Sequence, residues 1–336
     1  MFLAMAGCSS DLTTTSSLPI GSTPTGATSP LLQASPSASQ SIAPSPITRP
    51  QTIGDLADDI DAADIRSHLE ALQRIADANG GNRATGTSGF DASVEYVAER
   101  LATAGYDVQP HAFSAGQHSS VNLVAERTGT DTEGVMVGAH LDSVQAGPGI
   151  NDNASGVATL LVLAERLAGL PAPQRTIRFA FWGAEEGGRF GSQAYVDALD
   201  APGRALIAAY LNLDILGSPN FARFVYDEPS AAAGSREITA LFAEYFERRG
   251  LAWEPIDLTG DSDHAPFSAA GIPTGGLFSG GTEPKTDAHA AAFGGTAGLP
   301  ADACIHQACD TIANVSDASI DHMADAIAEV LATLAN

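Results

Sequence analysis

Six side chains of types that bind metal ions or carry protons are spread over the middle and the end of the chain. They are His140, Asp152, Glu185, Glu186, Asp214 and His306. Hydrolysis of an amide by water at neutral pH needs a water of lowered pKa, a proton acceptor and a means of stabilising negative charge. Two neighbouring zinc ions supply the first and the last of these, and a carboxylate supplies the second. Two imidazoles and three carboxylates are the ligands that such a centre requires, and the fourth carboxylate is left as the base.

Three apolar runs end next to these side chains. They are residues 135–140, 176–182 and 205–213, and each predicts a buried strand. The first run ends at His140, the second is followed by the glutamate pair, and the third by Asp214. Ligand sites in open α/β sheets lie beyond the carboxyl ends of the strands. The sequence therefore predicts that these groups meet at one edge of a sheet, although each signal alone has an ordinary structural interpretation.

The remaining periodicity predicts an α/β fold. Apolar residues recur at helical spacing in residues 65–76, 88–103, 154–170, 238–246 and 323–334, and residues 120–125 read as another strand. Strands that alternate with helices predict a mixed, mostly parallel central sheet with helices on both faces. We expect a single compact domain over residues 55–336.

The N-terminal part has a different composition. Residues 9–54 are crowded with Ser, Thr and Pro, which predicts a disordered linker. Residues 1–8 look like the end of a truncated lipoprotein signal, with Cys8 as the candidate lipidation site. A chance cysteine at a disordered start is the alternative. We expect an exported protein, either secreted or held at the bacterial cell envelope.

The charge of the chain limits its partners. The net charge is −24, and one lysine stands among 16 basic residues. Because phosphate binding needs clustered Lys and Arg, nucleic acid is not an expected partner. An acidic surface could attract the amino group of a peptide, or it could simply keep the protein soluble. No run after Cys8 is long and apolar enough to span a bilayer, so membrane attachment would require lipidation of Cys8. We expect a monomer.

Two cysteines enclose the last candidate ligand. Cys304 and Cys309 are five residues apart, with His306 between them. Such spacing suits metal binding in a cytosolic protein, whereas an exported chain favours a small disulfide loop. We favour the disulfide, which would hold His306 in place.

With these motifs, the chain resembles the secreted bacterial di-zinc leucyl aminopeptidases, a metallopeptidase family that also contains glutaminyl cyclases and glutamate carboxypeptidases. The resemblance covers residue 59 to the C-terminus. The matching stretches are residues 79–83, 138–143, 147–153, 182–186, 211–214, 262–267 and 304–309.

The resemblance implies a role for each residue. Asp152 would bridge two Zn²⁺ ions, with His140 and Asp214 completing one site and Glu186 and His306 the other. Glu185 would be the general base, and Asp142 would accept the second N–H of the His140 ring. Asp263 and His264 lie in a matching stretch, and a structural role for them is as consistent with the sequence as a catalytic one.

The resemblance also implies substrates. Peptides with a free N-terminus would bind, and residues 275–281, with Gly276 and Phe278, match the wall of the specificity pocket. An apolar wall favours Leu, Phe or Met as the first residue, although Phe278 could be a core residue instead. A Ca²⁺ site is implied at Asp59, the Ile60 carbonyl, Asp321 and Asp325, which could equally be ordinary surface acids.

Two differences from the family concern catalysis. Ile305 stands where the relatives have a Tyr that stabilises the oxyanion, and Asp261 runs directly into Ser262 where they insert Gly-Arg. Losing one such donor costs on the order of a hundredfold in rate. Two alternatives to the aminopeptidase follow, a glutaminyl cyclase with a single zinc and a catalytically weak relative kept for binding.

Overall fold

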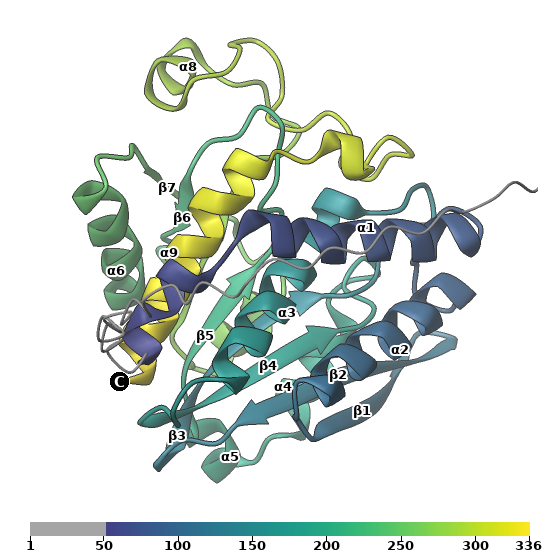
Figure 1. The fold of residues 1–336 in the computed structure, drawn as a ribbon, viewed down its shortest axis with the longest axis vertical. Helices are drawn as coiled ribbons and strands as arrows, with labels where there is room; N and C mark the ends of the chain where they lie inside the picture. The colour runs from purple at the N-terminus through teal and green to yellow at the C-terminus, as the bar shows by residue number, and fades with distance from the viewer. Residues whose placement is uncertain (1–51) are drawn as a thin grey trace, which may run out of the picture. The chain divides into compact units, whose positions relative to one another are not determined.

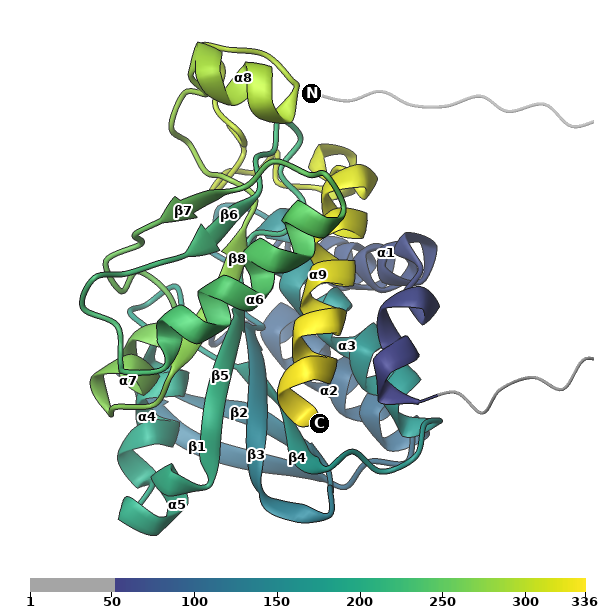
Figure 2. The ribbon, with the colours of Figure 1, turned by 90° about the vertical axis from the view of Figure 1, so that its left-hand side faces the viewer.

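The computed structural model describes residues 52–336, apart from the side chains of Asp58 and Asp59. The predictions for residues 1–8, for Cys8 and for nearly all of the linker lie outside this range. Within it, eight strands form one sheet in the order β1-β2-β4-β3-β5-β8-β6-β7 (Figures 1 and 2). The strands are β1 (Val108–Ala115), β2 (His118–Arg127), β3 (Asp131–His140), β4 (Arg175–Trp182), β5 (Ile207–Leu213), β6 (Phe224–Tyr226), β7 (Glu254–Ile256) and β8 (Thr274–Phe278).

The centre of the sheet is parallel and its margins are mixed. β4, β3, β5 and β8 run parallel to one another. At the margins, β2 pairs with β4 and β6 pairs with β8 in antiparallel fashion. The predicted fold class, a mixed and mostly parallel sheet with helices on both faces, is confirmed. Because parallel neighbours share a direction, β3, β4 and β5 end at the same edge, which is where the candidate residues follow them.

Helices cover both faces of the sheet (Figures 1 and 2). One face carries α3 (Ser155–Ala168), α6 (Ser235–Arg248) and α9 (Asp317–Ala335), with α1 (Ala62–Ala78) and α2 (Ser88–Thr103) packed beside them. The other face carries α4 (Phe190–Ala198) and α7 (His264–Ala269). The short helices are η1 (Ile53–Asp59), the π-turn η2 (Ile150–Ala154), α5 (Ala201–Ala205), α8 (Asp287–Phe293) and η3 (Ile312–Asn314).

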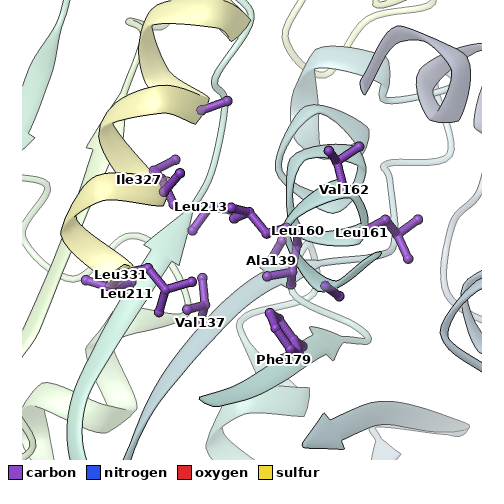
Figure 3. Packing of buried hydrophobic residues seen from close by; sticks show 14 of the residues in the cluster. Val137, Ala139, Leu160, Leu161, Val162, Phe179, Leu211, Leu213, Ile327 and Leu331 are labelled. Atoms are coloured by element: carbon purple, nitrogen blue, oxygen red, sulfur yellow. The ribbon is translucent and has the colours of Figure 1, made fainter. Parts of the chain in front are cut away.

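The larger core lies between the parallel strands and the pair α3 and α9. Figure 3 shows Val137 and Leu211 from two neighbouring strands packed against Leu160 of α3 and Leu331 of α9. All four side chains are fully buried. Burial of an aliphatic side chain of this size contributes about 1.5–3 kcal/mol. The strand ends therefore rest on a rigid layer, which fixes the directions of the residues that follow them.

A second core on the opposite face reaches to the site. Trp182, Tyr210 and Phe267 are buried there, and the rings of Tyr210 and Phe267 stack with centroids 3.9 Å apart. Gly138 of β3 permits this arrangement, because a Cβ would lie 2.4 Å from both the indole nitrogen of Trp182 and the hydroxyl of Tyr210. Among the described residues, no helix combines the length and the apolar composition that crossing a membrane requires.

Candidate metal centre

One group of side chains meets beyond the ends of β3 and β5. His140 is the last residue of β3, and Asp214 directly follows β5. Nε2 of His140 lies 3.3 Å from Oδ1 of Asp152 and 3.4 Å from Oδ1 of Asp214. The side chains of His140, Asp152 and Asp214 are 1%, 6% and 13% exposed. We call these three residues the inner triad.

A second group shares Asp152 with the first. Nε2 of His306 lies 3.1 Å from Oδ2 of Asp152 and 3.2 Å from Oε2 of Glu186. We call Asp152, Glu186 and His306 the outer triad; here the His306 side chain is 56% exposed. In each triad one candidate ligand atom per residue lies within 4.8 Å of the others. The five predicted ligands are thus brought together around the two oxygens of one carboxylate.

The main chain on both sides of Asp152 is held by hydrogen bonds. The N–H groups of Asn151 and Asp152 donate to the two carboxylate oxygens of Asp310, at 2.7 and 3.0 Å. The side-chain amide of Asn153 donates to the carbonyl oxygen of Leu213, at 2.8 Å, and so ties the turn to the end of β5. Asp310 comes directly after the disulfide loop, so its carboxylate links that loop to the turn that carries Asp152.

The disulfide between Cys304 and Cys309 is present, as predicted. His306 lies inside the loop that it closes, in the left-handed region with φ +60°. The loop packs tightly on the segment that follows β3, because a Cβ at Gly147 would lie 2.2 Å from the carbonyl oxygen of Gln307. The disulfide and this close approach hold an exposed imidazole against two buried carboxylates.

Asp142 lies beside the second ring nitrogen of His140 with two of its oxygens. Nδ1 of His140 lies 3.1 Å from the main-chain carbonyl oxygen of Asp142 and 3.7 Å from Oδ1 of its carboxylate, so the carboxylate contact stays a prediction beside a shorter carbonyl contact. The carboxylate is held elsewhere, because it accepts hydrogen bonds from the N–H of Glu185, at 3.0 Å, and from the hydroxyl of Thr85, at 3.2 Å. The carbonyl contact favours a proton on Nδ1, so once a cation displaces the other ring proton, the Nε2 lone pair would face the triad.

The residues present suit divalent cations. Oε1 of Glu186 and Oδ1 of Asp214 are buried and have no hydrogen-bond partner. Leaving a buried carboxylate oxygen without a partner is costly, so native proteins usually pair such atoms. Imidazole nitrogens together with carboxylate oxygens are ligands that zinc takes in proteins. Both triads therefore offer the donor types, in close groups, that would hold such ions.

The electrostatics show that the triads hold protons when no cation is bound. Burial opposes a charge on His140, but the carboxylates of Asp214, Asp142 and Asp152 raise the pKa of its imidazole well above the usual value. Hydrogen bonds to Asp152 and Glu186 raise the pKa of His306 to about 10. Burial raises the pKa of Glu185 to about 9. A nearby dication favours the deprotonated form of such groups, so cation binding would displace these protons.

A cavity of about 470 Å³, here called the main cavity, opens beside the two triads. Its apolar wall includes Phe278, Leu258, Ile305 and Tyr226. The other predicted wall residue, Gly276, is not among the lining residues. It lies beneath Tyr226, where a Cβ would come within 3.0 Å of the aromatic ring. A flat glycine strand therefore lets the Tyr226 ring pack against β8.

Comparison with known proteins agrees with this geometry. A model described as peptidase family M28 matches residues 122–331. The chain belongs to peptidase family M28. It is 45% identical over 281 residues to a leupeptin-inactivating enzyme from Streptomyces exfoliatus, and 46% identical over 220 residues to an aminopeptidase from Pseudomonas aeruginosa. These matches cover 82% and 63% of this chain but 62% and 41% of those proteins, so the chain spans about half the length of such relatives.

Solved structures share the fold of this M28 chain. An aminopeptidase from an Aneurinibacillus strain superposes with a TM-score of 0.69 at 17% identity, over 85% of this chain and 96% of that one. A zinc aminopeptidase from Bacillus subtilis superposes with a TM-score of 0.54 at 25% identity, over 64% of this chain and 50% of that one. The first likeness supports the fold alone.

The predicted calcium site of this M28 chain stays a prediction. η1, which ends at Asp59, packs against α9, and Asp321 and Asp325 lie about one turn apart on that helix. The side chain of Asp59 is outside the described residues.

One buried residue was missed by sequence reasoning. The guanidinium of Arg83 is fully buried and donates to the carbonyl oxygens of Pro148, at 2.9 Å, and Gly149, at 2.6 Å, and also to that of Leu141. It thereby fixes the segment between His140 and the turn that carries Asp152. The one available signal was the match of residues 79–83, which gave this residue no role.

Proposed function

We propose that this M28 chain is an exported zinc-dependent aminopeptidase that removes large apolar residues, such as Leu, Phe or Met, from the free N-terminus of peptides. The observation that carries the proposal is the position of Asp152. Its two carboxylate oxygens point in two directions, each towards a His that is accompanied by one further carboxylate. A structural ion pair needs one partner, whereas a bridge between two cations needs this divided geometry.

The two triads would each hold one zinc ion. His140, Asp214 and Oδ1 of Asp152 would hold the inner ion, and Glu186, His306 and Oδ2 of Asp152 the outer ion. Zinc bound in such a centre lowers the pKa of water and stabilises negative charge that develops on a carbonyl oxygen. The unpaired oxygens of Asp214 and Glu186 support this assignment, since bound cations would satisfy both.

Glu185 is the residue for proton transfer. It lines the main cavity beside the triads, and its main-chain N–H is fixed by Asp142 at 3.0 Å. Its carboxylate would take a proton from the attacking water and pass it to the departing amine. Burial and neighbouring acids raise the pKa of Glu185, whereas cations in the triads would lower it. An intermediate pKa suits both the uptake of a proton from water and its release to the amine.

The main cavity would receive the first side chain of the peptide. Its volume of about 470 Å³ and the apolar surfaces of Phe278, Ile305 and Leu258 suit a large apolar group. The carboxylates of Glu185 and Asp214 border the same cavity and would receive the substrate's ammonium group. A free N-terminus would therefore be required, because an acylated amine brings no positive charge.

The disulfide supports export, because such bonds persist in oxidising compartments. We further propose that the chain acts as a monomer and that any membrane attachment depends on Cys8.

Aminoacyl-anilides assayed on the full chain, with metal analysis of the same sample, test the proposal. Leucyl-anilide should be hydrolysed by the zinc-loaded protein, not after chelation, and again after zinc is restored. Glu185→Gln should keep its zinc and lose hydrolysis by more than ~10²-fold, the loss typical when one proton-transfer group is removed. N-acetyl-leucyl-anilide is the matched control and should not react. Full activity of Glu185→Gln, or cyclisation of N-terminal glutamine in place of hydrolysis, would contradict the proposal.

A further inference from the structure

A second cavity of about 330 Å³, here called the side cavity, borders the metal centre. Glu186 lines both this cavity and the main one. The rest of the main cavity is built chiefly from residues 214–306, whereas the side cavity is built from earlier segments. These are the turn before α2, the β1–β2 hairpin, residues 142–145 and residues 184–190. The two cavities therefore lie on either side of the outer triad's glutamate.

Phe190 forms an exposed aromatic wall of the side cavity. Its side chain is 39% exposed, and among the described residues only Leu206 and Leu299 are comparably exposed large hydrophobic groups. The ring lies against the main chain next to Glu186, because a Cβ at Gly187 would come within 3.2 Å of Cε2 of Phe190. An aromatic surface left open beside a reaction centre is expected where a ligand covers it.

The direction of the substrate follows from the position of Glu185. If the first side chain occupies the main cavity, the amine released by hydrolysis must lie within hydrogen-bond reach of the Glu185 carboxyl. That amine belongs to the second residue of the peptide. Glu185 sits in the same loop, residues 184–190, that forms one wall of the side cavity. Glu185 itself lines the main cavity, while its neighbours Ala184 and Glu186 line the side cavity. We therefore place the second residue at the boundary between the two cavities.

The charges of the side cavity select for an uncharged group. No Lys or Arg is among its lining residues in the described part of the chain, and its titratable groups are the acids Asp142 and Glu186 and the imidazole of His118. Both oxygens of Asp142 already accept hydrogen bonds, from Glu185 and Thr85, and the residue is buried. In the zinc-loaded protein Glu186 would be committed to the outer ion, so Asp142 is the like charge that a carboxylate at the second position would meet. A cation would find no uncommitted partner in Asp142.

From these observations we propose that the side cavity is the subsite for the second residue of the peptide, and that Phe190 gives it a preference for apolar, particularly aromatic, side chains. The inference rests on the proposed aminopeptidase function. Ala84 and Ala115 are buried, line the same cavity and add to its apolar surface.

The test compares second residues on one first residue, using zinc-loaded full-length protein. Hydrolysis of Leu-amide, Leu-Gly, Leu-Phe and Leu-Asp is measured for the wild type, Phe190→Ala and the control Leu206→Ala, whose exposed fraction is the same 39% but which lies outside the side cavity. In the wild type, kcat/KM for Leu-Phe should exceed that for Leu-Gly by roughly tenfold, the low end of what small apolar differences give in a pocket. Phe190→Ala should bring this ratio close to one, and Leu206→Ala should keep the wild-type ratio.

The substrates distinguish failure of the proposed aminopeptidase function from failure of the proposed subsite. If Leu-amide and every dipeptide resist hydrolysis, the proposed function fails and the subsite falls with it. If Leu-amide is hydrolysed but Phe190→Ala keeps the wild-type ratio, the subsite alone is overturned. Efficient cleavage of Leu-Asp, equal to that of Leu-Phe, would also overturn it.

Discussion

The two triads of the candidate centre are built in different ways although they share Asp152. The inner triad takes its imidazole from the end of a central strand and its second carboxylate from the residue after another, and all of it is nearly buried. The outer triad takes Glu186 from a loop and a half-exposed His306 from a disulfide-closed loop near the C-terminus. A side chain at a strand end is oriented by the packing of the sheet, whereas a side chain in a loop needs separate hydrogen bonds or a disulfide to orient it. We infer that the inner site is preorganised and that the outer site exchanges its cation more readily.

The largest expected effect comes from the residue that the triads share. Asp152→Asn removes one of the two charged oxygens that divide between the sites, so neither triad should hold zinc well. Activity should fall by more than the ~10²–10³-fold typical for loss of a single stabilising donor. Metal analysis and leucyl-anilide hydrolysis measure both effects. Asp197→Asn, at an exposed site on α4, is the matched control. Retention of two zinc ions by Asp152→Asn would contradict the claim that the two sites share Asp152.

Matched carboxylate-to-amide changes separate the two triads. Asp214→Asn should weaken the inner site and Glu186→Gln the outer site, each by more than the ~10–100-fold caused by changing a residue that only supports a ligand. Titration of the metal-free proteins with zinc should then give one tight ion in Glu186→Gln and one weaker ion in Asp214→Asn. Identical binding curves for the two variants would show that the triads do not differ as their burial indicates.

Metal removal should proceed in two phases. Dilution into a weak chelator should strip the outer ion first, because His306 is more than half exposed and every inner ligand is nearly buried. Each site saturated at a hundred times its Kd adds about 2.7 kcal/mol to the free energy of unfolding. Thermal unfolding recorded during removal should therefore fall in two steps. A single concerted step would contradict the difference in exchange.

The pH dependence sharpens the same contrast. In the metal-free protein the pKa of His306 is raised to about 10, so this group stabilises the fold fully below its unfolded value and loses that contribution as the pH rises towards 10. Zinc competes with this proton. The increase in Tm that zinc produces should thus be larger at pH 8.5 than at pH 6. An increment that does not change with pH would contradict proton displacement at the outer triad.

The smallest effect concerns the disulfide. Replacing both Cys304 and Cys309 by Ser removes the bond that closes the loop around His306, while the Asp310 contacts to the turn remain. Zinc affinity should fall roughly tenfold at the outer site, as when a residue that only supports a ligand is changed, and stay unchanged at the inner site. Competition with a chromogenic chelator measures both. An equal fall at the two sites would point to a general loss of structure.

The same contrast explains what the sequence could predict. β3, β4 and β5 are continuous apolar runs, and their ends carry His140, the glutamate pair and Asp214, so periodicity alone brought these residues to one edge. His306 and Asp152 lie in irregular turns, and only the resemblance to a known family placed them. Their positions depend on long-range bonds, such as those from Asp310 to the turn at Asp152, which have no local signature.

Local sequence patterns also could not predict the short and glycine-rich strands. β8 begins Thr274-Gly275-Gly276, which resembles a loop, and it becomes a strand because it pairs with β5 and β6. β6 and β7 have three residues each and depend on the same sheet. The sequence placed Asp142 beside His140, but nothing local to Asp142 shows that Thr85 and Glu185 also donate to its carboxylate or that its carbonyl oxygen lies nearer the ring.

Diffraction from zinc-soaked crystals at the zinc absorption edge tests the central claim most directly. We expect two anomalous peaks about 3.5–4 Å apart, one beside His140 and Asp214, the other beside Glu186 and His306, with the carboxylate of Asp152 between them. A single peak, or two peaks with Asp152 in contact with neither, would contradict the account.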